Sequence, residues 1–122
     1  MTDVAHTRGA WFDEHGNVVA ERLAQALQIT EAELAVATGL PRDAVTSPDG
    51  LRSLAAQQRL RQVTDLLTRI ESWAGALGAA WAWYRSYPIP PLGHLTAEAL
   101  VAAGRADEVR AYFTHISEGG YA

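Results

Sequence analysis

Apolar residues recur along most of the chain at the three- and four-residue spacing that is typical of amphipathic helices. The longest such pattern covers residues 51–77 and predicts one long helix that loosens near Gly75 and Gly78. The chain is therefore expected to adopt an all-α fold. Shorter patterns predict further helices over residues 18–29, 31–38, 79–84, 97–103 and 106–116. In the last of these, Ala106, Val109, Phe113 and Ile116 share one apolar face. The stripe of the long helix consists of Leu60, Val63, Leu66, Leu67, Ile70, Trp73, Ala74 and Leu77.

Residues 18–50 predict a helix-turn-helix-like unit. Thr30 and Glu33 form a capping-box pattern at the start of the second helix. Gly39 supplies the turn, and Pro41 opens a third helix a few residues later. This order, with the small Ala35 four residues before the glycine, is typical of a helix-turn-helix. The third helix is expected to be short, because the sequence Ser-Pro-Asp-Gly at 47–50 predicts a turn.

The residues before and after this unit complete the expected organisation. Residues 1–17 lack periodicity and predict a flexible arm. Trp11 and Phe12 of this arm are expected to pack back onto the first helix. Asn17 is a candidate N-cap for that helix. Residues 51–122 are expected to form a second unit. Most of the long-helix stripe is expected in the core. Its margin is expected to contact a second copy, because two-fold homodimers are the commonest oligomers.

A DNA-binding role for the first unit has weak support. Between residues 42 and 69 there are five arginines against three acids, but the third helix itself carries only one basic side chain. A helix-turn-helix retained as a structural or dimerising unit explains the pattern equally well. The candidate DNA contacts are Arg42, Thr46, Ser47, Arg52, Arg59 and Arg61.

Composition narrows the class of protein. The chain has 122 residues, of which 48% are apolar and 20% charged, as expected for a folded protein. All ten basic residues are arginine, the net charge is −4, and there is no cysteine, so neither a disulfide nor a thiolate metal site is expected. No apolar run approaches the roughly 18 residues that span a bilayer. Without a signal-peptide pattern either, a cytoplasmic protein is expected.

No pattern predicts catalysis. The four histidines are not spaced as metal ligands, and no phosphate-binding loop, dinucleotide fingerprint or nucleophile elbow is present. His94 follows a glycine in a shaped loop, where hydrogen bonding to the loop is favoured over a role as ligand or base. We therefore expect a protein that is not an enzyme and uses neither a metal nor a cofactor.

The last third of the chain has the most distinctive pattern. The aromatic segment at 81–85, Trp-Ala-Trp-Tyr-Arg, cannot turn all its rings inward, so at least one is expected at a protein–protein surface. It runs into a loop at 86–94 with three prolines, which fix φ and remove amide donors. The loop is expected to be a preformed extended arm rather than a helix. Thr96 is a candidate N-cap for the next helix. The arm carries Tyr87, Ile89 and Leu92.

These features resemble the toxin-binding domain of the Xre/MbcA/ParS antitoxins. The matching pieces are the aromatics before the loop, the segments PLGHLTAEALV and GRADEVRAYFTHI, and the final EGGYA. The resemblance covers roughly residues 51–122. The resemblance implies a helix-turn-helix region before this domain. It also implies a partner, a RES-domain toxin that degrades NAD, whose active-site cleft the antitoxin's carboxyl-terminal tail approaches.

The tail itself suits such a cleft. Gly119 and Gly120 release the last residues from the helix, and Tyr121 offers an aromatic ring with a hydroxyl. With the carboxylate of Ala122, the tail is a slender anionic peptide that fits a dinucleotide site. A frayed terminus is the alternative. The candidate toxin-binding residues are Trp83, Tyr84, Arg85, Tyr87, Ile89, Pro90, Leu92, Gly119, Gly120, Tyr121 and Ala122.

The sequence thus favours a type II antitoxin that neutralises a RES-domain toxin by occluding its active site with the tail, with repression of its own operon as a second expected activity. The alternative is a helix-turn-helix DNA-binding regulator without a toxin partner, which the early Pro48 disfavours. A third hypothesis is a dimeric scaffold in which the tail is dispensable.

Overall fold

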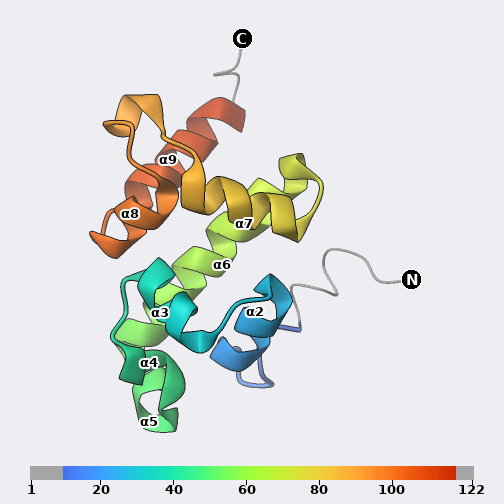
Figure 1. Cartoon of the computed structure of the whole chain (residues 1–122), viewed down its shortest axis with the longest axis vertical. Coiled ribbons are helices and arrows are strands. Elements are labelled where there is room, and N and C mark those ends of the chain that lie inside the picture. The colour runs from blue at the N-terminus through green and yellow to red at the C-terminus, as the bar shows by residue number, and fades with distance from the viewer. Residues whose placement is uncertain (1–9, 118–122) are drawn as a thin grey trace. The chain divides into compact units, whose positions relative to one another are not determined.

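The computed structural model describes residues 10–117, and this part of the chain is helical, with two isolated bridges and no strand (Figure 1). The predicted all-α fold is confirmed. The chain divides into two compact units, Met1–Arg61 and Gln62–Ala122. The boundary falls inside helix α6 (Leu54–Ala74) and not at the expected position between residues 50 and 51.

The N-terminal unit contains α2 (Ala20–Leu27), α3 (Glu31–Thr38), α4 (Arg42–Thr46), α5 (Pro48–Leu51) and the first turns of α6. Helix α3 has the predicted bounds. The Thr30 hydroxyl accepts a bond from the Glu33 amide at 3.0 Å, and the Glu33 carboxylate accepts one from the Thr30 amide at 2.9 Å. Gly39 then ends the helix with a φ of +72°.

Residues 1–9 of the predicted arm lie outside the described residues, and the rest of it is more ordered than predicted. Residues 11–17 form a loop rather than a loose arm: the amide of Val19 donates to the carbonyl of Trp11 at 2.8 Å, and Trp11 is buried as expected. Asn17 does not cap a helix from residue 18. Instead, Val18 pairs with Phe12 in a bridge, and α2 starts two residues later.

A distant glutamine explains the shift in the start of α2. Gln57, on α6, accepts a hydrogen bond from the amide of Val18 at 2.8 Å and donates to the carbonyl of Val18 at 3.1 Å and of Leu51 at 3.0 Å. Gln57 is itself buried. The backbone of Val18 is thus satisfied by a side chain 39 positions away, and it does not need a helical partner.

The segment at 47–50, predicted as a turn, contributes to a short helix. The Ser47 hydroxyl accepts a bond from the Gly50 amide at 3.3 Å, and Pro48 occupies the first helical position of α5, where its missing amide costs nothing. A Cβ on Gly50 would collide with the carbonyl of Asp43, so the glycine permits α4 and α5 to pack closely. Helix α4 is as short as expected, with five residues.

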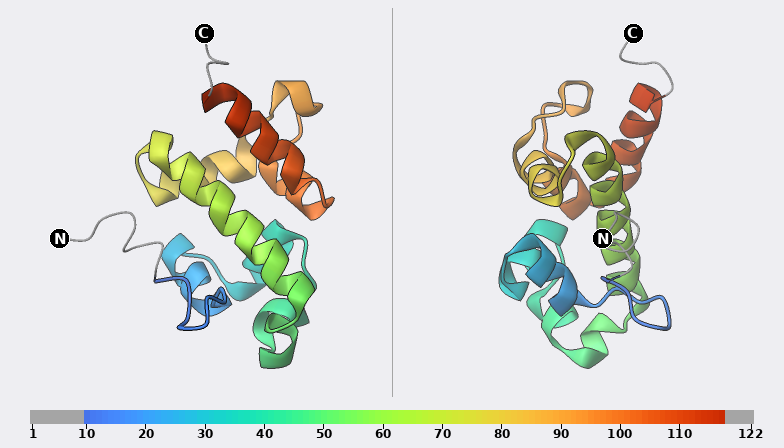
Figure 2. Two further views of the ribbon diagram at one scale, coloured as in Figure 1. Left: turned by 180° about the vertical axis from the view of Figure 1, so that it is seen from behind. Right: turned by 90° about the vertical axis from the view of Figure 1, so that its right-hand side faces the viewer.

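The C-terminal unit contains the rest of α6, α7 (Leu77–Ser86), the 3-10 turn η1 (Pro90–Leu92), α8 (Ala97–Ala102) and α9 (Ala106–His115). Helix α7 contacts α8, and α8 contacts α9. Helix α9 lies beside the second half of α6 (Figure 2). Asp65 of α6 links the two through Arg110 of α9 at 3.7 Å, and it also pairs with Arg69 of its own helix at 3.6 Å. Buried α6 residues in this unit include Val63, Leu66, Leu67 and Ile70.

The long helix is shorter at both ends than the predicted span of 51–77. Its C-terminal end falls at Ala74 because Gly75 has a φ of +92°, which breaks the helix and begins the turn into α7. Helix α7 then starts at Leu77, two residues earlier than predicted. The Thr96 hydroxyl caps α8 as expected, accepting from the Ala99 amide at 3.1 Å.

The proline-rich loop is not a fully extended arm. Pro90 and Pro91 begin η1, because a φ near −65° also fits the first turn of a helix. The amides of Leu92 and His94 both donate to the carbonyl of Ile89 at 3.0 Å, which closes the loop on itself. Ile89 is fully buried, so it does not project from an arm.

No helix in the described part of the chain is long and apolar enough to span a membrane.

Candidate protein-binding surface

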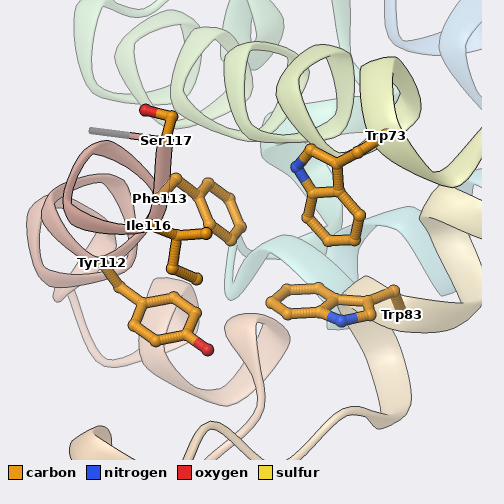
Figure 3. Close-up of a pocket in the computed structure, with 6 residues that line it drawn as sticks. All are labelled: Trp73, Trp83, Tyr112, Phe113, Ile116 and Ser117. Carbon is orange, nitrogen blue, oxygen red and sulfur yellow. The ribbon is translucent and has the colours of Figure 1, made fainter. Parts of the chain in front are cut away.

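An aromatic pocket of about 370 Å³ opens in the C-terminal unit (Figure 3). Its walls come from the last turn of α6, from α7, and from α9 with the two residues that follow it. The pocket has almost no polar lining, which suits an apolar or aromatic side chain. The lining residues are Trp73, Trp83, Tyr112, Phe113, Ile116 and Ser117.

The helix break at Gly75 sets the position of the two tryptophans. Because α7 turns back directly after α6, Trp73 meets Trp83 edge to face, with ring centroids 5.4 Å apart and planes at 85°. Phe113 lies 6.1 Å from Trp73 and 5.4 Å from Trp83, and it is buried. Such aromatic pairs contribute about 0.5–1.5 kcal/mol each beyond their buried area, so the pocket walls hold one another in place.

The pocket continues into an exposed aromatic surface. Trp73 is 54% exposed and Tyr87 is 38% exposed. Tyr87 stacks on Trp83, with centroids 4.8 Å apart and planes at 15°. Burial raises the pKa of the Tyr112 hydroxyl, and the neighbouring hydroxyl of Tyr87, with which it shares a hydrogen bond, raises that pKa further. Large exposed aromatics that are held rigidly in this way are characteristic of protein-binding hot spots.

The residues predicted to bind a toxin do not all share this surface. Trp83 lines the pocket and Tyr87 flanks it, while Pro90 is exposed and Leu92 half-buried in the following turn. Tyr84 and Ile89 are fully buried and belong to the core of the unit. The predicted tail residues Gly119, Gly120, Tyr121 and Ala122 lie outside the described residues.

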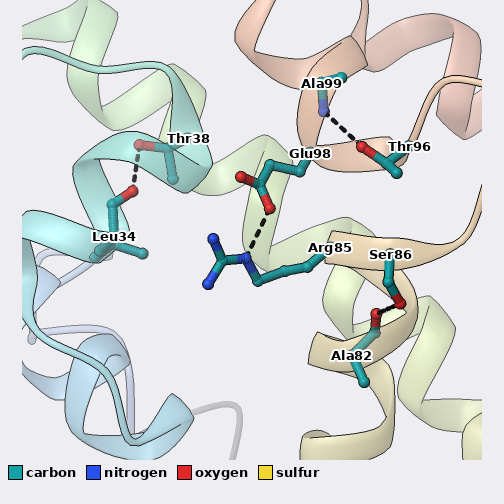
Figure 4. A network of polar contacts seen from close by, with 8 residues as sticks. All are labelled: Leu34, Thr38, Ala82, Arg85, Ser86, Thr96, Glu98 and Ala99. Carbon is teal, nitrogen blue, oxygen red and sulfur yellow. Dashed lines mark hydrogen bonds and ion pairs between the residues drawn. The ribbon is translucent and has the colours of Figure 1, made fainter.

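Arg85 is fixed by two neighbours. Its Nε donates to the Glu98 carboxylate at 2.7 Å, which joins α7 to α8 (Figure 4). Its guanidinium also lies over the Trp81 ring at 5.5 Å, and Trp81 stacks on Tyr84 at 5.3 Å. Because Arg85 is also exposed, its guanidinium is held in a fixed position at the surface.

Sequence reasoning missed most of the pocket. The sequence places Trp73 in the apolar stripe of the long helix and Phe113 and Ile116 on the apolar face of the last helix, without any indication that they converge. Tyr112 and Ser117 were not singled out at all. The available clue was a tryptophan in the last turn of a helix before a glycine, followed by two more tryptophans. If the chain reverses at that glycine, the tryptophans on either side of it can come into contact.

In the N-terminal unit, most of the candidate DNA contacts serve the fold. Arg59 donates to the carbonyl of Thr38 at 2.7 Å, and Arg61 donates to the carbonyl of Gly16 at 3.0 Å. The Thr38 hydroxyl in turn bonds the carbonyl of Leu34 (Figure 4). These two arginines therefore tie α6 to the rest of their unit.

Most of the remaining candidate DNA contacts also bond to neighbouring residues of their own unit. Arg52 pairs with Asp49 at 2.7 Å, which cancels its charge locally. Thr46 bonds back to the carbonyl of Arg42 at 3.0 Å, and Ser47 caps α5. Arg42 is exposed at the first position of α4. A DNA-binding role for these residues remains a prediction.

Within residues 10–117, no group of three or more His, Cys, Asp or Glu side chains is arranged to hold a metal ion. His94 is exposed, with a φ of +62°, and its backbone amide donates to the carbonyl of Ile89 at 3.0 Å. Comparisons with protein-family models, with curated proteins and with solved structures gave no match to this chain.

Proposed function

We propose that this protein is a type II antitoxin that binds a RES-domain, NAD-degrading toxin through its C-terminal unit and neutralises it with the tail at 119–122. The proposal rests on the resemblance of residues 51–122 to the Xre/MbcA/ParS antitoxins. The single structural observation that supports it is the rigid, exposed aromatic surface around Trp73, Trp83 and Tyr87.

This surface suits a protein partner better than a substrate. Its pocket is lined by rings and carries almost no polar groups with which to orient a reaction. Trp73 exposes more than half of its surface, which is unusual for a tryptophan and leaves a large apolar area to be covered. Arg85, paired with Glu98, adds a positioned guanidinium group on α7. These features support a binding protein.

Co-expression with the protein encoded by the neighbouring reading frame tests the proposal. We expect a stable complex by size exclusion, and no consumption of NAD by that complex. A chain shortened after Glu118 should still bind through the aromatic surface but should leave the toxin active. If the neighbouring protein neither binds this chain nor degrades NAD, the antitoxin proposal is wrong.

Repression of the operon is the second part of the proposal. Of the predicted contacts, Arg42 is the one best placed to reach DNA, because it is exposed and the other arginines bond within their own unit. An electrophoretic mobility shift with the promoter upstream of the gene, using the toxin complex and the free chain, tests this part separately.

A further inference from the structure

We infer that the aromatic pocket of the C-terminal unit binds a small quaternary ammonium compound through the faces of its rings. Three observations lead to this ligand: the angles between the lining rings, the absence of a charged side chain among the described residues that line the pocket, and the pocket's size. The ligand is one of the isolated chain, so the inference does not depend on the toxin proposal.

The rings that line the pocket meet at steep angles. Trp73 stands at 85° to Trp83 and at 75° to Phe113, and Phe113 is inclined at 53° to Trp83. Three contacting rings that are inclined to one another form the corner of a box. Figure 3 shows the two tryptophans on one side of the pocket and Tyr112, Phe113 and Ile116 on the other. Such a lining presents ring surfaces from several directions, which suits a rounded group.

A flat aromatic ring is matched less well. Rings favour offset stacking against a parallel neighbour, which needs an open slot between parallel walls. Two ring pairs within residues 10–117 are nearly parallel, Trp81 with Tyr84 at 11° and Trp83 with Tyr87 at 15°. Both pairs are already stacked on each other, so neither leaves a slot for a further ring.

The electrostatics of the lining favour a cation that forms no hydrogen bonds. Ring faces carry negative potential and attract cations, and a quaternary ammonium group has no N–H that must be satisfied. The described lining residues include no arginine that would repel the ligand and no carboxylate, so the ring faces are the attractive groups. The net charge of −4 on the whole chain acts in the same direction over longer distances.

The size of the pocket points to a free small molecule. Its volume of about 370 Å³ is near the lower end of ligand pockets, which cover roughly 300–1,000 Å³. This volume holds a trimethylammonium head with a short stem without the help of a peptide groove. A trimethyllysine side chain carries the same head on a longer stem, and its affinity therefore distinguishes the two sources.

Binding of choline, compared with that of the dimethylbutanol in which carbon replaces the quaternary nitrogen, gives the direct test. In two-dimensional NMR, choline should shift the indole N–H signals of Trp73 and Trp83 and leave that of Trp11, in the other unit, unchanged. Choline should bind about tenfold more tightly than its uncharged analogue, because only the cation gains from the ring faces. Equal affinity for the two compounds, or no shift with choline, would overturn the inference.

Trp73→Leu separates a ring face from apolar surface in general. Trp73 is the most exposed of the lining rings. Leucine keeps an apolar side chain there, so the preference for choline over dimethylbutanol should fall from about tenfold to about threefold, whereas Trp73→Phe should retain most of it. A folded Trp73→Leu variant with an unchanged preference would contradict the inference, and the comparison in the wild type decides alone if that variant does not fold. Free trimethyllysine that binds much more tightly than choline would overturn the assignment to a small molecule.

Discussion

Replacement of Trp73 by alanine provides the sharpest test of the proposed toxin-binding surface. A tryptophan can bury up to about 250 Å², so the 54% that Trp73 exposes corresponds to about 135 Å². At about 25 cal/mol per Å², covering this area would contribute about 3 kcal/mol. Part of this gain is offset by the cost of association. We therefore expect Trp73→Ala to weaken toxin binding by about 2 kcal/mol, which is about a 30-fold higher Kd.

The measurement is a titration of purified toxin by calorimetry with wild type and variant. Trp73→Ala also removes edge-to-face contacts with Trp83 and Phe113, so circular dichroism must first show that the variant is folded. Trp73→Phe keeps part of the ring and should lose less affinity. The matched control is Leu54→Ala, because Leu54 is 73% exposed but lies in the N-terminal unit and should not affect binding.

The reasoning would be refuted by a folded Trp73→Ala variant that binds the toxin within twofold of the wild type. An equal loss of affinity in Leu54→Ala would refute it in a different way, since the effect would then follow from apolar exposure in general and not from this surface.

Three further predictions concern the N-terminal unit. Gln57→Leu should lower the free energy of unfolding by about 3 kcal/mol, because three backbone groups lose their hydrogen-bond partner. The control Gln58→Leu, at an exposed position, should change it by less than about 0.5 kcal/mol. Urea titrations measure both values. The backbone amide of Asn17 and, to a lesser degree, that of His15 hold the pKa of Asp13 below its usual 3.8. That contribution to stability is complete above pH 3.8 and is lost as the pH falls through the lower folded pKa, so Asp13→Asn should flatten acid unfolding curves in this window. Arg42→Ala should weaken promoter binding in a mobility shift, and an unchanged shift would remove α4 from any DNA contact.

Elements with local causes were predictable from the sequence. The capping box at Thr30, the stop at Gly39 and the cap at Thr96 each depend on residues within four positions, so the sequence contains the whole signal. The prediction that Ala106, Val109 and Phe113 lie on the buried face of α9 is also confirmed, because helical periodicity alone decides which face is buried.

Elements with distant causes were not predictable. The start of α2 depends on Gln57, which reaches Val18 across 39 positions. The pocket depends on the angle between three helices, and no spacing pattern encodes the edge-to-face meeting of Trp73 with Trp83. Ile89 was assigned to an exposed arm because the prolines indicated extension, but the closing of the loop on the Ile89 carbonyl turns that residue inward.

Because helix α6 belongs to both units, neither unit can be expressed alone with its core intact. Its first turns supply Ala56, Gln57 and Leu60 to the core of one unit, and its later turns supply Val63 and Ile70 to the core of the other. A fragment of residues 51–122 would carry unpaired core residues from the lost unit and would be prone to aggregate. Because a truncated helix frays from its new end, loss of structure in one unit would also lower the cooperativity of unfolding in the other.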